Sequence, residues 1–299
     1  MTNNKWTLKS RFDLYLQLGK FRLCLLVLFT ALIGYGLGVS QLIFAEMFCF
    51  LFGTLLTAMG ANGLNQWWER KRDALMLRTR KRPIPSGRLS SGHALTVTLV
   101  WSLTGMLLLY YGVNSLTACL ALITLTSYVL IYTPLKPYST VAILAGAIPG
   151  AIPPMMGWTA ATNHFGVEAW VLGCLLFLWQ IPHFMSLAAI YRQDYAKGGY
   201  QLLPDNPEIE GVTRSIIVIF SVALLCITLL TPFVGLGQKT FFLGAFLFGL
   251  ALLVVSIRLY QQYSVKNARQ VFLASIMYLP ALMTLLLIDE RFVSHYWSF

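Results

Sequence analysis

The sequence predicts an all-α integral membrane protein with nine membrane-spanning helices, and three observations indicate this fold class. First, 57% of the 299 residues are hydrophobic and only 11% are charged, whereas soluble proteins average about 25% charged residues. Second, apolar stretches of about 20 residues, the length that crosses a bilayer, recur from Phe21 to Ile288. Third, Lys and Arg concentrate in alternate loops between these stretches, as expected for a multi-pass protein.

These apolar stretches and loops divide the chain into three segments. A cytoplasmic segment, 1–20, can form an interfacial helix, a single membrane domain covers 21–290, and 291–299 is a short outer tail. The third and fourth spans are separated only weakly, at Asn114, and loops that contain Lys or Arg separate the last four. The expected spans, in chain order, are 21–39, 43–64, 94–113, 115–132, 140–158, 169–190, 215–235, 241–259 and 271–288.

The net charge of +11 follows mainly from membrane topology. With these spans, 20 of the 22 Lys and Arg residues fall on one side, and only Lys239 and Arg291 fall on the other. The positive-inside rule then places the N-terminus in the cytoplasm and the C-terminus outside. We therefore expect no nucleic-acid partner. A short N-terminal extension without a signal peptide favours a bacterial plasma (inner) membrane over a mitochondrial one.

Asn65, Glu69 and Asp73, here called the polar triplet, stand four positions apart at the end of the second span. In a helix, a spacing of four residues returns to nearly the same face. Polar side chains at a membrane boundary also need partners. The spacing therefore predicts one helical face that presents an amide and two carboxylates.

Six of the eleven acidic residues lie in two loops on the predicted cytoplasmic side. The first polar loop, 69–88, is strongly basic, and the second polar loop, 191–214, contains Asp194. A transporter would more often place ionisable groups near the bilayer midplane. Spans that are nearly free of charge, with polar groups at one mouth, favour an enzyme that holds a charged substrate head at the interface.

Acidic residues followed by a basic cluster suit a diphosphate that is bridged by a divalent metal. Mg²⁺ is usually held by one or two carboxylates and by substrate phosphates, and Arg binds phosphate oxygens in bidentate fashion. The candidate phosphate contacts in the first polar loop are Arg78, Lys81, Arg82 and Arg88. Simpler interpretations exist: a basic loop follows from topology, and an acidic residue at a helix end can be solvated.

Four segments resemble the UbiA superfamily of intramembrane prenyltransferases and, within it, the heme O synthase branch (protoheme IX farnesyltransferases). Two are superfamily-wide: Asn65-Gln-Trp-Trp-Glu69-Arg-Lys-Arg-Asp73 with the following Arg78-Thr79-x-x-Arg82-Pro83, and Tyr132-Thr133-Pro134-Leu135-Lys136. Two are specific to the heme branch: the Gly- and Pro-rich stretch 146–158, and Trp179-Gln-Ile-Pro-His183-Phe184 with the following Arg192-Gln-Asp194. The resemblance covers nearly the whole chain.

The resemblance implies nine helices around a central cavity that opens to the cytoplasmic side. It implies transfer of farnesyl from farnesyl diphosphate to a vinyl group of heme B, with water addition, giving heme O. Mg²⁺ would be held by the polar triplet and Asp194. The diphosphate contacts would be the four basic residues named above together with Lys136, Arg192 and Lys197. The residues expected to line the heme and prenyl cavity are Tyr132, Trp158, Trp179, His183, Phe184 and Tyr191.

The chain departs from the superfamily pattern at two positions. Glu69 stands where many members have Asp, which keeps a carboxylate, so metal binding should survive. Asp194 is followed four positions later by Gly198, where many members have a second acid. This single acid puts in doubt full carboxylate sets on both sides of the metal, and Arg192 and Lys197 can contact phosphate instead.

Three assignments keep simpler alternatives. Lys136 can be one more lysine of the positive-inside pattern. His183 precedes Asp194 by 11 residues, about 16 Å along a helix, so we expect it inside the membrane. There it can contact the porphyrin, ligate its iron, accept a proton or only form an interhelical hydrogen bond. The glycines and prolines of 140–158 can pack helices closely or form a flat wall against the acceptor.

Two rival functions remain open. A UbiA-type enzyme with another aromatic acceptor, such as 4-hydroxybenzoate, would share the polar triplet, and an assay of heme B against an aromatic acid would separate the two. A non-enzymatic transporter of heme or lipid would have polar residues across several spans and need no metal. An association with heme A synthase or a terminal oxidase is not indicated by any residue.

Overall fold

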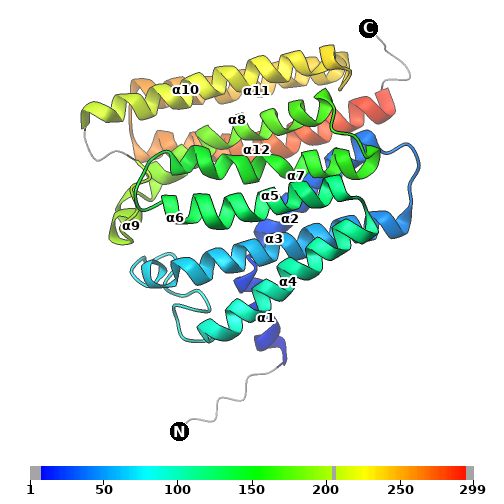
Figure 1. Ribbon diagram of the computed structural model, residues 1–299. Coiled ribbons are helices and arrows are strands. Elements are labelled where there is room, and N and C mark those ends of the chain that lie inside the picture. The colour runs from blue at the N-terminus through cyan, green and yellow to red at the C-terminus, as the bar shows by residue number, and fades with distance from the viewer. Residues whose placement is uncertain (1–7, 204–206, 294–299) are drawn as a thin grey trace.

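The computed structural model describes residues 8–203 and 207–293, and all regular structure within them is helical. Long helices lie side by side, and loops gather at the two ends of the bundle (Figure 1). The long helices are α2 (Phe21–Gly38), α3 (Phe44–Asp73), α4 (Ser91–Gly112), α7 (Ala142–Thr162), α8 (Val167–Ile190), α10 (Pro207–Leu230), α11 (Lys239–Gln261) and α12 (Val265–Ile288). The shorter elements are α1 (Leu8–Leu18), α5 (Ser115–Thr126), η1 (Ser127–Tyr132), α6 (Thr133–Leu135), α9 (Arg192–Lys197), η2 (Thr231–Val234) and η3 (Asp289–Val293).

The predicted all-α membrane fold is confirmed. Within the described residues, eight helical segments are long and apolar enough to cross a membrane, and they coincide with eight of the nine predicted spans. The remaining predicted span, 140–158, forms α7, which contains three prolines and packs against α2, α5 and α8. The protein is therefore a multi-pass membrane protein, and the count of nine spans stays a prediction.

Glycine residues let α2 and α7 approach each other closely. A Cβ atom at Gly157 of α7 would overlap the carbonyl oxygen of Ala31, and one at Gly34 of α2 would overlap the carbonyl oxygen of Pro154. Both obstacles are backbone atoms, which cannot move aside as a flexible side chain would. Small residues at such crossings are typical of helix packing in membranes. These contacts support the packing interpretation of the Gly- and Pro-rich stretch.

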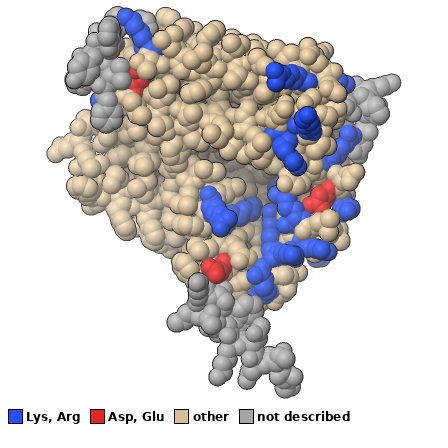
Figure 2. Space-filling model, turned by 180° about the vertical axis from the view of Figure 1, so that it is seen from behind, with Lys and Arg blue, Asp and Glu red and all other residues tan. Residues whose placement is uncertain are grey.

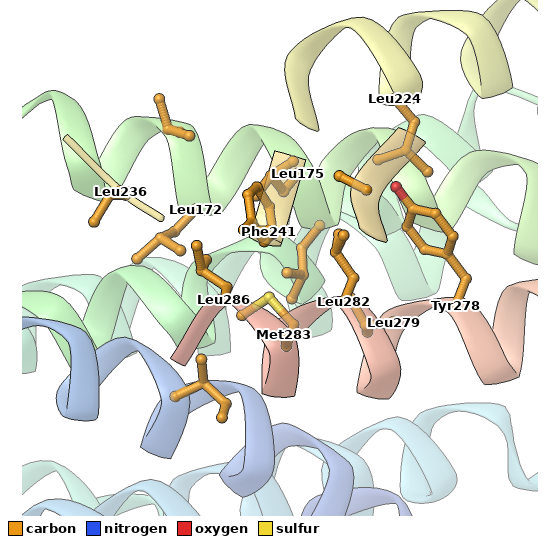
Figure 3. Packing of buried hydrophobic residues seen from close by; sticks show 14 of the residues in the cluster. Leu172, Leu175, Leu224, Leu236, Phe241, Tyr278, Leu279, Leu282, Met283 and Leu286 are labelled. Atoms are coloured by element: carbon orange, nitrogen blue, oxygen red, sulfur yellow. The ribbon is translucent and has the colours of Figure 1, made fainter. Parts of the chain in front are cut away.

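Side chains of α8, α10, α11 and α12, with a few from α2 and α7, form a large apolar core, which Figure 3 shows from close by. Leu175 of α8, Leu224 of α10, Phe241 of α11 and Leu282 of α12 belong to this cluster, and at most 1% of each residue is exposed. Lipid is as apolar as these side chains, so their contribution to stability comes mainly from close packing.

Charged residues after α12 bind two helix ends, at the end of the bundle opposite α9 (Figure 1). Oδ2 of Asp289 accepts hydrogen bonds from the backbone N–H groups of Gln238 (2.5 Å) and Phe241 (3.0 Å) at the start of α11. Arg291 donates to the carbonyl of Gly36, 2.7 Å away, near the end of α2. An anion at a helix N-terminus and a cation at a helix C-terminus are both stabilising. Of the predicted tail 291–299, residues 294–299 lie outside the described part.

Candidate active site

Helix α3 continues nine residues past the predicted span, to Asp73, and so carries the whole polar triplet. Asn65 and Asp73 are 0% exposed and Glu69 is 5% exposed. Buried polar side chains require hydrogen-bonding or charged partners. The predicted single polar face is therefore present, and it faces other helices and loops of the protein.

Each carboxylate of the polar triplet forms an ion pair with a basic residue that was predicted to bind diphosphate. Lys136, just after α6, places its Nζ 2.8 Å from Oε1 of Glu69. Arg82, in the first polar loop, places its Nη1 2.6 Å from Oδ2 of Asp73. These pairs bring two of the seven predicted phosphate contacts to the polar triplet.

Lys20 supplies a third cation, which the sequence analysis did not assign to the site. It lies just before α2 with a left-handed backbone (φ 50°) and donates a hydrogen bond to Oδ1 of Asn65, 3.1 Å away. Burial, and then the positive charges of Arg82 and Lys136, lower the pKa of Lys20 to about 7. Three cations thus surround two carboxylates, and a bound anion would relieve their repulsion.

A π-helical segment connects the polar triplet to the Tyr132–Lys136 region. The side-chain amide of Asn65 donates to the Oγ1 of Thr133 (3.0 Å), and that hydroxyl donates to the carbonyl of Tyr128 (2.8 Å). Tyr128 belongs to η1, a π-helix, and such segments are rare and often lie at functional sites. The Lys136 ammonium lies 4.3 Å from the ring centroid of Tyr132. The amide of Asn65 is therefore held in one orientation by Lys20 on one side and by Thr133 on the other.

The oxygen atoms of the polar triplet fit a divalent cation of the Mg²⁺ type. Oδ1 of Asp73 is buried and has no hydrogen-bond partner among the described residues. Carboxylate and amide oxygens are the ligands that Mg²⁺ prefers, with substrate phosphates and water completing its shell. Within the described part of the chain, no three His, Cys, Asp or Glu side chains are grouped closely enough to hold a metal. The Glu69 and Asp73 carboxylates are therefore not joined by a third acid.

Asp194 was predicted as a metal ligand, but here it binds the backbone of the first polar loop. Its carboxylate accepts hydrogen bonds from the N–H groups of Leu77 (2.8 Å) and Arg78 (3.3 Å). Arg78 in turn lies over the rings of Tyr191 and Tyr195, at 5.3 and 5.4 Å. The two polar loops are thus joined as expected, but the four predicted ligands are not gathered in one cluster, because two backbone N–H groups already satisfy Asp194.

The other predicted phosphate contacts lie around the polar triplet at the same end of the molecule. Figure 2 shows Lys and Arg side chains gathered at the end where the first polar loop and α9 lie. Arg78, Arg192 and Lys197 line a cleft of about 580 Å³ beside α9. Lys81 and Arg88 line a separate cleft of about 520 Å³. Of the seven predicted phosphate contacts, Arg82 and Lys136 form ion pairs with the polar triplet.

The predicted cavity residues fall into separate groups. Tyr132 lies beside the polar triplet, and its ring fills the space that a Cβ at Gly146 would take. Trp179, His183 and Phe184 form an aromatic group on α8, in which the His183 and Phe184 ring centroids are 5.5 Å apart. Trp158 packs against Gly38 at the far end of α7, so the structure does not bring it to the polar triplet.

Comparison with known proteins identifies the family. Residues 27–279 match the profile of the UbiA prenyltransferase family. The chain belongs to this family. The relatives of this UbiA-family chain include a protoheme IX farnesyltransferase of Solibacter usitatus (strain Ellin6076), which is 40% identical over 92% of this chain and 98% of the relative. Another protoheme IX farnesyltransferase, from Flavobacterium psychrophilum, is 35% identical over 95% of this chain and 96% of its own length.

Solved structures show the same UbiA fold. A digeranylgeranylglyceryl phosphate synthase structure matches with a TM-score of 0.80 at 13% identity, covering 94% of this chain and 99% of that protein. A UbiA homolog from Archaeoglobus fulgidus bound to GPP and Mg²⁺ matches with a TM-score of 0.60 at 13% identity, covering 91% and 99%. At these identities the likeness concerns the fold alone.

Proposed function

We propose that this UbiA-family chain transfers a farnesyl group from farnesyl diphosphate to a vinyl group of heme B, giving heme O. The C1–O bond of farnesyl diphosphate breaks with both electrons on the diphosphate oxygen. Farnesyl C1 then bonds to the terminal vinyl carbon, the adjoining carbon takes hydroxide from water, and one proton is released. The relatives that are 35–40% identical over almost the whole chain all carry the name protoheme IX farnesyltransferase, which supports this acceptor.

The arrangement of charges around the polar triplet is the observation that carries the proposal. Lys20, Arg82 and Lys136 approach one buried group of oxygen atoms from three different parts of the chain. A cation with a lowered pKa between two others is destabilised until an anion binds. A diphosphate, with several charged oxygens, is the anion that this arrangement suits. Arg82 and Lys136 would then exchange their carboxylate partners for phosphate oxygens, and Lys20 would exchange the Asn65 amide oxygen in the same way.

The carboxylates released by this exchange can hold a divalent metal. Glu69 and Asp73, with the amide oxygen of Asn65, would hold Mg²⁺, and the buried Oδ1 of Asp73 has no hydrogen-bond partner within the described part of the chain. When bound, the metal neutralises phosphate charge and makes diphosphate a better leaving group. The Archaeoglobus fulgidus homologs solved with GPP and Mg²⁺ or with DMAPP and Mg²⁺ support this assignment at the level of the fold.

Orientation in the membrane follows from the same charges. The basic end of the bundle (Figure 2) would face the cytoplasm, so that farnesyl diphosphate binds from that side while its chain extends among the helices. The C-terminus then lies outside, in a bacterial plasma membrane. The heme acceptor would reach the aromatic group of α8, which lies deeper than the polar loops. Asp194, Arg78, Arg192 and Lys197 would form the rim through which the diphosphate enters.

The experiment that tests this function is reconstitution of the purified protein in lipid nanodiscs with heme B, farnesyl diphosphate and Mg²⁺. Mass spectrometry should find a product heavier than heme B by one farnesyl group and one hydroxyl group, together with released diphosphate. The matched acceptor control is 4-hydroxybenzoate in place of heme B. Prenylation of the aromatic acid without any heme product would contradict the heme assignment while keeping the family chemistry. Release of diphosphate in neither reaction would contradict both.

A further inference from the structure

The imidazole of His183 is bound at one nitrogen by Ser275 of α12. Nδ1 of His183 lies 2.9 Å from the Oγ of Ser275. That hydroxyl donates its proton to the carbonyl of Phe272, 2.7 Å away. Because a hydroxyl has only one proton, Oγ must accept the hydrogen bond from His183, and Nδ1 must carry a proton. In the neutral ring, Nε2 is then the nitrogen with a free lone pair.

Aromatic rings fix the orientation of this imidazole. The ring of Trp179 is stacked on it at 4.8 Å between centroids (19° between planes), and that of Phe272 at 4.9 Å (25°). Trp179 is itself held, because its indole Nε1 donates to the carbonyl of Ser275, 2.7 Å away. These two stacked rings restrict the rotation of the imidazole, so the direction of Nε2 is set by α8 and α12.

The Nε2 atom has no hydrogen-bond partner among the described residues, whereas Nδ1 has one. His183 lies seven residues before Ile190, the end of α8, which is about 10 Å along the helix axis. Phe177 and Phe184, on the same helix, pack against the buried apolar clusters. The Nε2 lone pair of His183 is therefore held in one orientation, inside the membrane and among apolar rings. Such a nitrogen suits coordination of a metal ion that is bound within a planar apolar ligand.

We propose that Nε2 of His183 is an axial ligand to the iron of the heme acceptor, and that Ser275 is a positioning residue that fixes its tautomer. This inference rests on the proposed function, because it requires heme to bind here. Metal-ligating histidines almost always donate their other ring N–H to a carboxylate, a carbonyl or water. Ser275 has that role here and passes the hydrogen bond to the Phe272 carbonyl.

The test is spectroscopic and does not depend on turnover. The purified protein in nanodiscs is titrated with heme B, and resonance Raman of the ferrous complex reports the iron–imidazole stretching band. The wild type should show this band. His183→Ala should lose it, bind heme about 10- to 100-fold more weakly, and regain a similar band when free imidazole is added. His93→Ala and His164→Ala, which change histidines near loops, are the matched controls and should keep the wild-type band.

Ser275→Ala tests the positioning role with little change in side-chain volume. It should keep the iron–imidazole band but shift its frequency, because the ligand loses its hydrogen-bond acceptor. If His183→Ala does not fold, Ser275→Ala decides: a shifted band supports the inference and an unchanged band contradicts it. Heme that binds to wild type and to His183→Ala with the same spectrum overturns the ligation but leaves the proposed function standing. Failure of the wild type to bind heme overturns the proposed acceptor as well.

Discussion

Lys136 and Glu69 are separated by 67 residues in the chain, yet Nζ of Lys136 lies 2.8 Å from Oε1 of Glu69. Burial disfavours the charged form of Lys136, but the Glu69 carboxylate raises the pKa of Lys136 well above its ordinary value. The lysine therefore stays positive at neutral pH in a largely buried position. The pair joins the end of α3 to the end of α6 and supplies both signs of charge that a metal–diphosphate complex needs.

Removing either carboxylate of the polar triplet should abolish turnover. Glu69→Gln and Asp73→Asn are expected to lower kcat for heme O formation by about 100-fold or more, because each removes charge stabilisation at the leaving group. Product is measured by mass spectrometry per mole of folded protein. Glu46→Gln, at the other end of the same helix, is the control and should turn over like wild type. Near-normal turnover in Glu69→Gln or Asp73→Asn would contradict the assignment.

A double variant at Glu69 and Lys136 should recover stability without recovering activity. Glu69→Gln alone leaves Lys136 buried without its counter-charge, which we expect to cost about 3–5 kcal/mol of unfolding free energy. Adding Lys136→Met removes the unpaired charge and should restore most of this stability, measured by thermal unfolding in detergent. Turnover should stay absent in the double variant. Recovery of activity together with stability would show that the pair is structural only.

Substitution of Lys20 should weaken diphosphate binding without loss of stability. Lys20→Met removes a partly buried cation that lies near two others, so the unfolding free energy should stay equal or rise. The Kd for farnesyl diphosphate should rise about 30-fold or more, as for loss of a buried charge contact. Lys20→Arg keeps the charge and should retain most of the affinity. Lys71→Met, an exposed lysine of α3, is the control, and equal affinity in Lys20→Met would remove Lys20 from the site.

Asp289 should matter for stability alone. Asp289→Ala removes the acceptor for two backbone N–H groups at the start of α11, and leaving such groups unpaired costs about 1–3 kcal/mol. The expected result is a lower unfolding temperature with unchanged KM for farnesyl diphosphate. Asp13→Ala, at an exposed acid of α1, should change neither quantity. A changed KM with normal stability would place Asp289 in the reaction instead.

The fold and one half of the candidate site could be predicted from the sequence because both depend on local patterns. Apolar length gave the spans, and the spacing of four put Asn65, Glu69 and Asp73 on one helical face. The basic cluster after them was predicted to bind phosphate, and one of its residues, Arg82, proves to pair with Asp73. Family resemblance pointed to Lys136, which proves to contact Glu69. These features require only helical geometry and the charge of neighbouring segments.

The rest depends on tertiary contacts that no local pattern carries. Lys20 looks like any lysine at a membrane boundary, and only the packing of α2 against α3 brings it to Asn65. Asp194 was expected beside the metal, but its carboxylate accepts hydrogen bonds from two backbone N–H groups, those of Leu77 and Arg78. Trp158 belongs to the Gly- and Pro-rich stretch 146–158 and was predicted to line the cavity. It lies near the C-terminal end of α7, and the length of this helix places it far from the polar triplet. The sequence did not indicate the role of Ser275 as a partner of His183, because a serine in an apolar span usually forms a hydrogen bond within its own helix.

The account's central claim is that the α3 carboxylates and the three cations form one metal–diphosphate site. Calorimetric titration of purified protein with farnesyl thiodiphosphate, a slow-reacting analogue, tests it most directly, with and without Mg²⁺. The wild type should bind at least 10-fold more tightly with Mg²⁺, and Asp73→Asn should show no such gain. An equal gain from Mg²⁺ in Asp73→Asn, or none in the wild type, would contradict the claim.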